Sequence, residues 1–251
     1  MIRVALVGAG GRMGTAIRDQ ADSLADLQVT LAFVSQRSTL SLPQVRHQPS
    51  ELKDVDVVID ISNPATCIEY AQAAARLGIP FVSGTTGLDA ESLAALAVCA
   101  QKIPVLHTAN FSVGINILEH LVELAARAAA GFDVEIFEAH HRRKVDAPSG
   151  TALLLGKAAA RGREVRLDDV AVFDRHGVTG ARTDSEIGFQ VMRGGGIVGE
   201  HTVFLVSEGE RIELTHRAHD RGVFAQGALR AAYWIAAKQA GTYTMRDVLF
   251  G

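Results

Sequence analysis

The first 14 residues join an apolar segment to a glycine-rich turn, and this arrangement constrains the fold more than any other feature of the sequence. Residues 2–7 are apolar apart from Arg3, which is typical of a buried β-strand. The turn that follows reads Gly8-Ala9-Gly10-Gly11-Arg12-Met13-Gly14, and a helix is expected to open within it. Glycines at a strand-to-helix junction let the backbone approach a pyrophosphate group at the helix N-terminus. The segment therefore predicts the first βα unit of a dinucleotide-binding domain.

The spacing of these glycines is G-x-x-G-x-x-G, formed by Gly8, Gly11 and Gly14. The commoner spacing G-x-G-x-x-G is not met, because Met13 stands at its last position. Such a motif alone also fits a tight strand-to-helix turn that binds nothing. Its place directly after the first expected strand favours a nucleotide site, and the plain turn stays open as the alternative.

Short apolar segments and alanine-rich segments of helical period alternate over the first 110 residues. Strands are expected at 29–34, 55–62, 80–84 and 104–108, and helices at 64–77 and 90–102. The strands are apolar throughout rather than alternating, which indicates a parallel sheet covered by helices on both faces. This is the pattern of right-handed βαβ units, so we expect a doubly wound α/β domain of the Rossmann type.

The regular alternation of strands and helices ends after residue 110, and a second domain with a mixed, largely antiparallel sheet is expected. Its helices are predicted at 112–130 and 149–161, and its strands at 134–139, 187–192, 202–207 and 211–216. A last helix, at 223–239, is expected to pack back on the first domain. The predicted domains are therefore residues 1–111 with 221–251, for the dinucleotide, and residues 112–220, for substrate binding, catalysis and oligomerisation.

Composition narrows the class of protein. Of the 251 residues, 48% are hydrophobic and 21% charged, which excludes a disordered or fibrous chain. The net charge of −3 gives no basic field for nucleic acid, and no segment reaches the roughly 18 apolar residues that a membrane span needs. Arg12 ends the first apolar run too early for a signal peptide, and Cys67 and Cys99 are expected to be buried thiols, so the expected location is the cytoplasm.

The end of the second expected strand bears on the choice of nicotinamide cofactor. An NAD-selective site places a carboxylate there to hold the ribose hydroxyls. The stretch here is Ser35-Gln36-Arg37-Ser38, with no acid and one arginine. Arg37 is expected to pair with the 2′-phosphate of NADPH, and a solvated loop arginine stays open as the alternative.

A basic cluster in the second half indicates an anion site with proton chemistry. Five nitrogenous side chains follow one another from His140 to Lys144 in a mildly acidic protein. Ser149 is then expected to cap a helix whose first backbone N–H groups, at Gly150 and Thr151, bind an anion such as a carboxylate. Histidine can also donate a proton near neutral pH.

Two alternatives for this cluster are less favoured. A patch for nucleic acid lacks interleaved aromatic side chains and any wider basic surface. A metal site is disfavoured because His140 and His141 would point to opposite sides of a strand, and no carboxylate or cysteine stands at ligand spacing.

These segments resemble the 4-hydroxy-tetrahydrodipicolinate reductase (dihydrodipicolinate reductase) family, which acts in lysine biosynthesis through diaminopimelate. The matching segments occur in family order along the whole chain. They are Val7 to Gly14, Gly84-Thr85-Thr86-Gly87, Ala109 to Gly114, Glu138 to His141 with Lys144 to Ala152, and Arg193 to Thr202. The segment from Glu138 to Ala152 is highly specific, whereas the first is shared with many dehydrogenases.

The resemblance implies a nicotinamide cofactor, NADPH or NADH, no metal, and a small dicarboxylate substrate. Hydride would reach a ring carbon as its 4-hydroxyl is lost, with His140 as the proton donor and Lys144 as the catalytic lysine. His141, Ser149, Gly150 and Thr151 would contact the substrate. The implied cofactor residues are Gly8, Ala9, Gly10, Gly11, Arg12, Met13, Gln36, Arg37, Gly84, Thr85, Thr86, Ala109, Asn110, Phe111 and Ser112.

One position departs from the family pattern, and two alternative functions stay open. Many relatives have an acid before the arginine where this chain has Gln36, so NADPH is expected to serve at least as well as NADH. A different two-domain oxidoreductase and a non-catalytic NADPH sensor stay open. Homotetramers are common in the family, and an exposed sheet surface with Val203, Leu205, Ile212 and Leu214 is expected to supply the interface.

Overall fold

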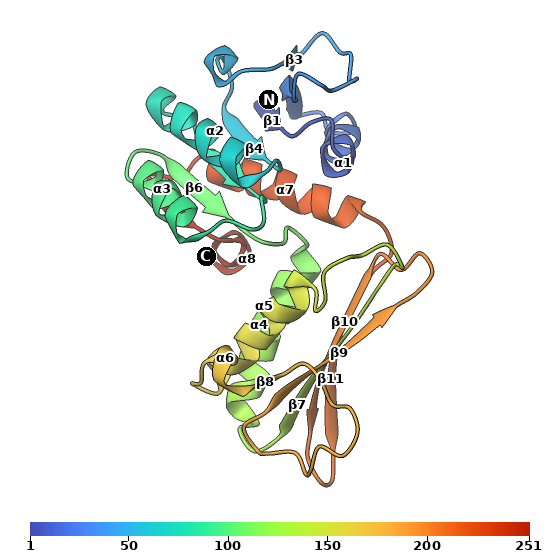
Figure 1. Cartoon of the computed structure of the whole chain (residues 1–251). Helices are drawn as coiled ribbons and strands as arrows, with labels where there is room; N and C mark the ends of the chain where they lie inside the picture. Colours follow the sequence, from blue (N-terminus) through green and yellow to red (C-terminus); the bar gives the residue numbers. More distant parts are fainter. The chain divides into compact units, whose positions relative to one another are not determined.

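The computed structural model describes residues 1–251, and the chain forms two compact units (Figure 1). The first unit comprises residues 1–113 and 221–251, and the second comprises residues 114–220. The chain therefore leaves the first unit once and returns to it for its last 31 residues. No helix is both long and apolar enough to cross a membrane.

A seven-stranded sheet, parallel throughout, forms the centre of the first unit. The strand order reverses beside β1, with β2 on one side and β4 on the other, which confirms the doubly wound Rossmann-type fold. The strands in sheet order are β12 (Gly241–Tyr243), β6 (Pro104–His107), β5 (Phe81–Ser83), β4 (Val57–Asp60), β1 (Ile2–Val7), β2 (Leu27–Phe33) and β3 (Val45–Arg46).

Helices cover both faces of this sheet, which is why its strands are apolar throughout. Successive side chains of β1 enter opposite cores: Val4 and Leu6 pack on one face, and Ala5 and Val7 on the other. The first core includes side chains of α1 (Arg12–Ala21), α7 (Gly222–Ile235) and α8 (Met245–Phe250). The second includes α2 (Pro64–Leu77) and α3 (Ala90–Ala100), with both cysteines buried and free; a 3₁₀ turn, η1 (Pro49–Glu51), lies between β3 and β4.

The returning helix α7 packs closely on the end of the first segment. A side chain at Gly227 would collide with the backbone carbonyl of Phe111, so only glycine allows this approach. This contact ties residues 221–251 to the loop after β6.

The second unit is a mixed five-stranded sheet with helices. Strands β11, β10 and β7 are antiparallel neighbours, whereas β7, β9 and β8 run parallel. The strands in sheet order are β11 (Arg211–Ala218), β10 (Gly199–Val206), β7 (Asp133–His140), β9 (Ile187–Arg193) and β8 (Ala171–Val172). The helices are α4 (Val113–Ala128), α5 (Gly150–Gly162) and α6 (Leu167–Val170).

Four apolar residues of this sheet were predicted to be exposed, and the prediction is wrong for two of them. Val203 and Leu205 have no exposed area, because they pack with α4 and α5 in the core of the unit. Ile212 is 40% exposed and Leu214 is half-buried against the same core. Since side chains alternate along a strand, Phe204 of β10 belongs to the opposite face, which the two helices leave uncovered.

Candidate active site

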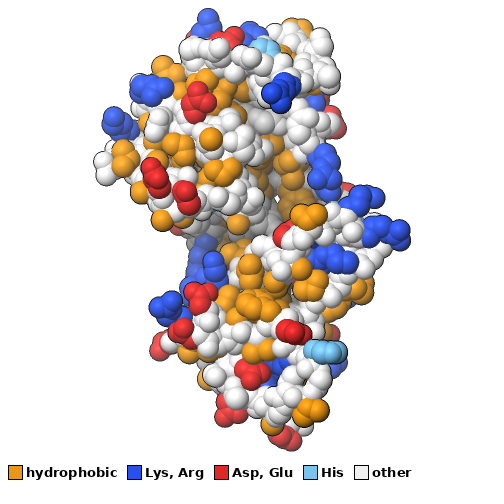
Figure 2. All heavy atoms as spheres, in the orientation of Figure 1, with side chains coloured by type: hydrophobic (Ala, Val, Ile, Leu, Met, Phe, Trp, Pro, Cys, Tyr) orange, Lys and Arg blue, Asp and Glu red, His pale blue; other side chains and the backbone are white.

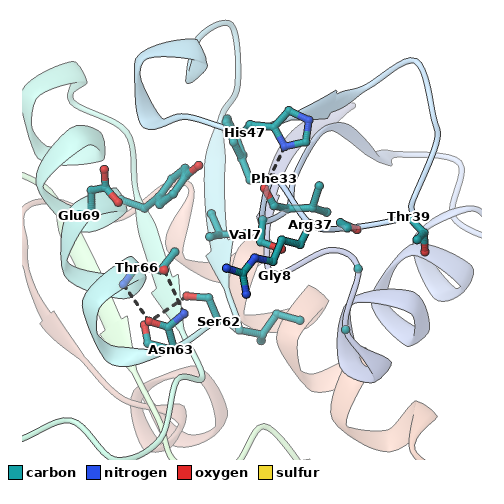
Figure 3. A pocket seen from close by; sticks show the side chains of 17 residues that line it. Val7, Gly8, Phe33, Arg37, Thr39, His47, Ser62, Asn63, Thr66 and Glu69 are labelled. Carbon is teal, nitrogen blue, oxygen red and sulfur yellow. Dashed lines mark hydrogen bonds between the residues drawn. The ribbon is translucent and has the colours of Figure 1, made fainter.

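A cavity of about 560 Å³ lies in the first unit at the carboxyl ends of β1, β2 and β4, where the strand order reverses (Figure 3). Ligands of open parallel sheets bind at this point. The lining residues are Val7, Gly8, Gly10, Gly11, Phe33, Val34, Ser35, Arg37, Ser38, Thr39, His47, Ile61, Ser62, Asn63, Thr66, Glu69 and Tyr70.

The glycine-rich turn forms one wall of this cavity, and the backbone requires glycine at two of its positions. Gly8 has φ +85° and a Cβ there would lie 2.6 Å from the carbonyl oxygen of Ile61. A Cβ at Gly14 would lie 2.5 Å from the carbonyl oxygen of Gly8, so only glycine lets α1 pack this closely on the turn. Gly11 caps α1 without a side-chain hydrogen bond, which leaves the positive helix end available to an anionic group.

The remaining residues predicted around this turn occupy different places. Ala9 is fully buried and Met13 packs against the core, so their side chains face away from the cavity. Arg12 is exposed at the start of α1 and does not line the cavity. Arg37 does line it, and in Figure 3 its guanidinium extends toward Ser62. Gln36 lines an adjacent hollow instead.

Most of the residues that line the cavity were not predicted as cofactor residues, although the local pattern around Asn63 is a signal. Asn63 caps α2, accepting a 3.2 Å hydrogen bond from the Thr66 backbone N–H, and Pro64 takes the first helical position. The sequence Ser62-Asn63-Pro64 after a buried strand is therefore a helix start at the same sheet edge as the glycine turn. His47 reaches the cavity from farther along the chain, where its Nδ1 donates to the carbonyl of Val34 over 3.2 Å.

Asp60 ties together the loops after β4 and β5. Its carboxylate is fully buried at the end of β4 and accepts hydrogen bonds from Ser83 Oγ (2.9 Å) and Thr85 Oγ1 (2.7 Å). The hydroxyl of Ser62 donates to it as well. Since Ser62 lines the cavity and Thr85 belongs to the predicted cofactor set, one carboxylate orders both.

The other predicted cofactor residues lie at the carboxyl ends of β5 and β6, outside the described cavity. The ring of Phe111 occupies the space where Gly84 lacks a side chain, so the two loops pack together. Asn110 accepts from the Ser112 backbone N–H over 2.8 Å, which shapes the second loop. Phe111 and Ser112 are buried, whereas Thr86 and Ala109 are exposed.

In the second unit, a buried carboxylate holds the predicted proton donor. Glu138 and His140 lie on the same face of β7, and Glu138 Oε2 is 2.6 Å from His140 Nδ1. Arg193 of β9 donates to both oxygens of Glu138 over 2.8 Å, and the Ser149 backbone N–H donates over 3.0 Å. Burial alone would raise the pKa of Glu138, but the hydrogen bonds from these three residues outweigh it and lower the pKa to about 2.

Lys144 lies in the loop that leaves β7. Its Nζ is 2.8 Å from both carboxylate oxygens of Asp146, and this ion pair lowers the pKa of Asp146. The loop is anchored by its backbone, since the His141 N–H donates to the carbonyl of Ile197 over 2.8 Å and Arg193 donates to the carbonyl of Asp146 over 2.7 Å. Asp146 is therefore contacted by both Lys144, at its carboxylate, and Arg193, at its backbone carbonyl.

The hydroxyl group of Ser149 forms hydrogen bonds within the protein. Its hydroxyl accepts from the Ala152 N–H at 3.1 Å, capping α5, and shares a 2.9 Å hydrogen bond with His201 Nε2. Only 2% of Ser149 is exposed, so its hydroxyl orders the helix start, whereas Gly150 is exposed. Burial, reinforced by the neighbouring His140, lowers the pKa of His201 to about 3, so His201 is neutral near pH 7.

The sequence matches two models that together span almost the whole chain. Residues 2–111 match the N-terminal model of dihydrodipicolinate reductase, and residues 114–249 match the C-terminal model. The chain belongs to the dihydrodipicolinate reductase family. As a dihydrodipicolinate reductase family member, it is an oxidoreductase that uses a nicotinamide cofactor.

Named relatives agree with this assignment. The 4-hydroxy-tetrahydrodipicolinate reductase of Acinetobacter baumannii is 45% identical, with 98% of this chain and 96% of the relative covered. That of Caulobacter vibrioides is 44% identical, with coverage of 99% and 97%. A dihydrodipicolinate reductase structure from Paenisporosarcina sp. TG-14, described as dipicolinate-bound, has the same fold (TM-score 0.80, 24% identity, 97% of each chain). The sequence relatives and the shared fold therefore agree with each other.

Proposed function

We propose that the chain reduces 4-hydroxy-2,3,4,5-tetrahydrodipicolinate to 2,3,4,5-tetrahydrodipicolinate in lysine biosynthesis through diaminopimelate. The observation that carries the proposal is the cluster of Glu138, His140 and Lys144 beside the start of α5, in a chain of this family. A histidine held by a buried carboxylate can deliver a proton, and a lysine beside a helix N-terminus can bind a carboxylate.

The cavity at the strand reversal is proposed to hold the nicotinamide cofactor. Gly8, Gly10 and Gly11 would bind its pyrophosphate at the start of α1, which has no side-chain cap. Arg37 would bind the ribose end of the cofactor. The loops of Thr85 and Asn110 would lie against the nicotinamide ribose. When bound, the cofactor supplies the hydride that replaces the 4-hydroxyl group.

The second unit is proposed to bind the dicarboxylate and move the proton. Lys144, His141 and the backbone N–H groups of Gly150 and Thr151 would hold the two carboxylates. Elimination of the 4-hydroxyl together with a hydrogen of the neighbouring ring carbon would release water and leave a C–C double bond conjugated with the imine. When hydride is added to C4 of this double bond, His140 would deliver one proton to the neighbouring carbon and be reprotonated from solvent, so one hydride and one proton are consumed for each water released. Basic and acidic side chains both occur on the visible face of each unit in Figure 2.

A coupled assay tests this activity. Substrate is generated in place by the synthase that makes it, and NADPH oxidation is followed by absorbance. We expect oxidation that depends on both the synthase product and this protein. NADPH binding without oxidation would favour the non-catalytic sensor, and oxidation only with another carbonyl or hydroxy substrate would favour a different oxidoreductase.

Cofactor preference depends on Arg37 in this proposal. NADPH is expected to serve at least as well as NADH, because Arg37 lines the cavity and no carboxylate stands in the Ser35–Ser38 stretch. Arg37→Ala is expected to raise the KM for NADPH about 10-fold or more, the worth of a charged hydrogen bond, and to leave the KM for NADH nearly unchanged. Gln36→Ala is the matched control. A wild-type preference for NADH of tenfold or more would contradict the proposal.

We also propose a cytoplasmic homotetramer, as the family resemblance implies. The surface proposed for the interface is the face of the second sheet that carries Phe204 and Met192, opposite α4 and α5. Light scattering is expected to give four times the mass of 26.7 kDa. A monomer at assay concentration would contradict this proposal.

A further inference from the structure

Glu138 is a buried side chain outside the set predicted from the sequence, and it accepts four hydrogen bonds. Only 1% of its side chain is exposed, and both of its oxygens accept hydrogen bonds from three different segments: β7 itself, β9 and the start of α5. A carboxylate this deeply buried is costly to keep ionised without such partners. Because its oxygens are occupied from within the protein, Glu138 acts through its neighbours and does not contact the substrate.

The contact between Glu138 and His140 determines which ring nitrogen is free. An ionised carboxylate only accepts hydrogen bonds, so the hydrogen of the 2.6 Å contact is on His140 Nδ1. The other nitrogen, Nε2, is then the atom that can exchange a proton with a ligand. Gly199 of β10 leaves room beside it, since a Cβ at that position would lie 3.1 Å from Nε2.

We propose that Glu138 is a positioning residue that holds His140 in its Nδ1–H form, with Nε2 as the proton-donating atom, and fixes the start of α5 beside it through the Ser149 N–H. This inference rests on the proposed role of His140. Carboxylate partners orient catalytic and metal-binding histidines in the same way, and they stabilise the imidazolium form.

The charges around His140 leave Glu138 as its one direct ionic partner. Arg193 from β9 contacts Glu138 rather than the imidazole, and Lys144 is paired with Asp146 in the loop after β7. His201 from β10 packs edge-on against His140 at 5.1 Å between ring centroids, and its burial keeps it neutral. Loss of the Glu138 charge is therefore expected to make the His140 imidazolium less stable.

The test is Glu138→Gln in the full-length enzyme. The substitution keeps the shape and removes the charge, so kcat is expected to fall about 10- to 100-fold. The alkaline limb of the kcat–pH profile is expected to move toward lower pH, because the protonated His140 loses the carboxylate that neutralises its charge. The KM for NADPH should stay within about twofold, since the cofactor residues lie elsewhere.

Glu135→Gln provides a matched control on the same strand. Glu135 lies on the opposite face of β7 and is also paired with two arginines, Arg175 and Arg182. Its replacement removes the same charge from the same strand, and the pH profile should not move. A shift as large in this control would assign the effect to general loss of structure and overturn the inference.

A measurement on the wild-type protein keeps the inference testable if Glu138→Gln fails to fold. Nitrogen NMR of labelled imidazoles, recorded with His140 neutral, is expected to show the hydrogen on Nδ1. A hydrogen on Nε2 would overturn the inference, as would an active Glu138→Gln enzyme with unchanged kcat and pH profile. An inactive wild-type enzyme would instead contradict the proposed function, and the NMR result would still decide the state of His140.

Discussion

Replacing His140 with alanine is expected to lower kcat by about 10²–10⁴-fold, the usual contribution of a positioned general acid. The side chain is 11% exposed, so it can meet a ligand, and Glu138 orients it. Nucleotide affinity should stay nearly intact, because the glycine turn and Arg37 belong to the other compact unit. Steady-state kinetics give kcat, and quenching of protein fluorescence by NADPH gives the affinity.

His141→Ala is the comparison that separates the two adjacent histidines. The structure anchors His141 through its backbone N–H to Ile197, whereas it is the imidazole of His140 that contacts the Glu138 carboxylate. We therefore expect this variant mainly to raise the KM for the substrate. Wild-type-like kcat in His140→Ala, or a larger kcat loss in His141→Ala, would show that the proton donor is misassigned.

Much of the fold was predictable because local patterns and local structure agree. Continuous apolar strands separated by helices can only be buried in a parallel sheet covered on both sides, and β1 shows this alternation residue by residue. The N-terminal cap of α5 could be predicted from the Pro148-Ser149 pair, because capping depends on residues that are neighbours in the sequence. The glycine turn was readable for the same reason.

The contacts that could not be predicted join residues far apart in the chain. Glu138 meets Arg193 from 55 positions away, and Asp60 meets Thr85 from 25 positions away, so no spacing rule reveals either cluster. Short elements such as β12, β8 and α8 carry too few residues to show a period.

The error at Val203 and Leu205 has a different cause. An alternating strand pattern identifies two faces, but it does not say which face the helices of the same unit cover. The more apolar face was assigned to a partner, whereas α4 and α5 cover it. Helices α4 and α5 are amphipathic or alanine-rich, and their own apolar sides require a sheet to pack on.

Replacing Lys144 with alanine is expected to lower kcat by about 10²–10³-fold, comparable to the loss of one charged or polar donor at a reacting group. Its Nζ is 2.8 Å from both oxygens of Asp146, and Arg193 holds the backbone carbonyl of Asp146, so this charge is already positioned by the loop. In the proposed mechanism a dianionic substrate would compete with Asp146 for Lys144, and transfer of the ammonium group to the substrate would cost little because one carboxylate replaces another. Kinetics and NADPH binding measure the two effects separately.

Asp146→Asn is the matched control, because Arg193 holds the backbone carbonyl of residue 146 and so keeps the loop in place without the carboxylate. This variant releases Lys144 from its resting partner, and we expect kcat within a few-fold of wild type with an equal or lower KM for the substrate. Lys144→Arg should not restore the rate, since a planar guanidinium cannot take the position of a compact ammonium. If Lys144→Ala retains kcat while Asp146→Asn loses it, the carboxylate and not the ammonium is the group that acts on the substrate.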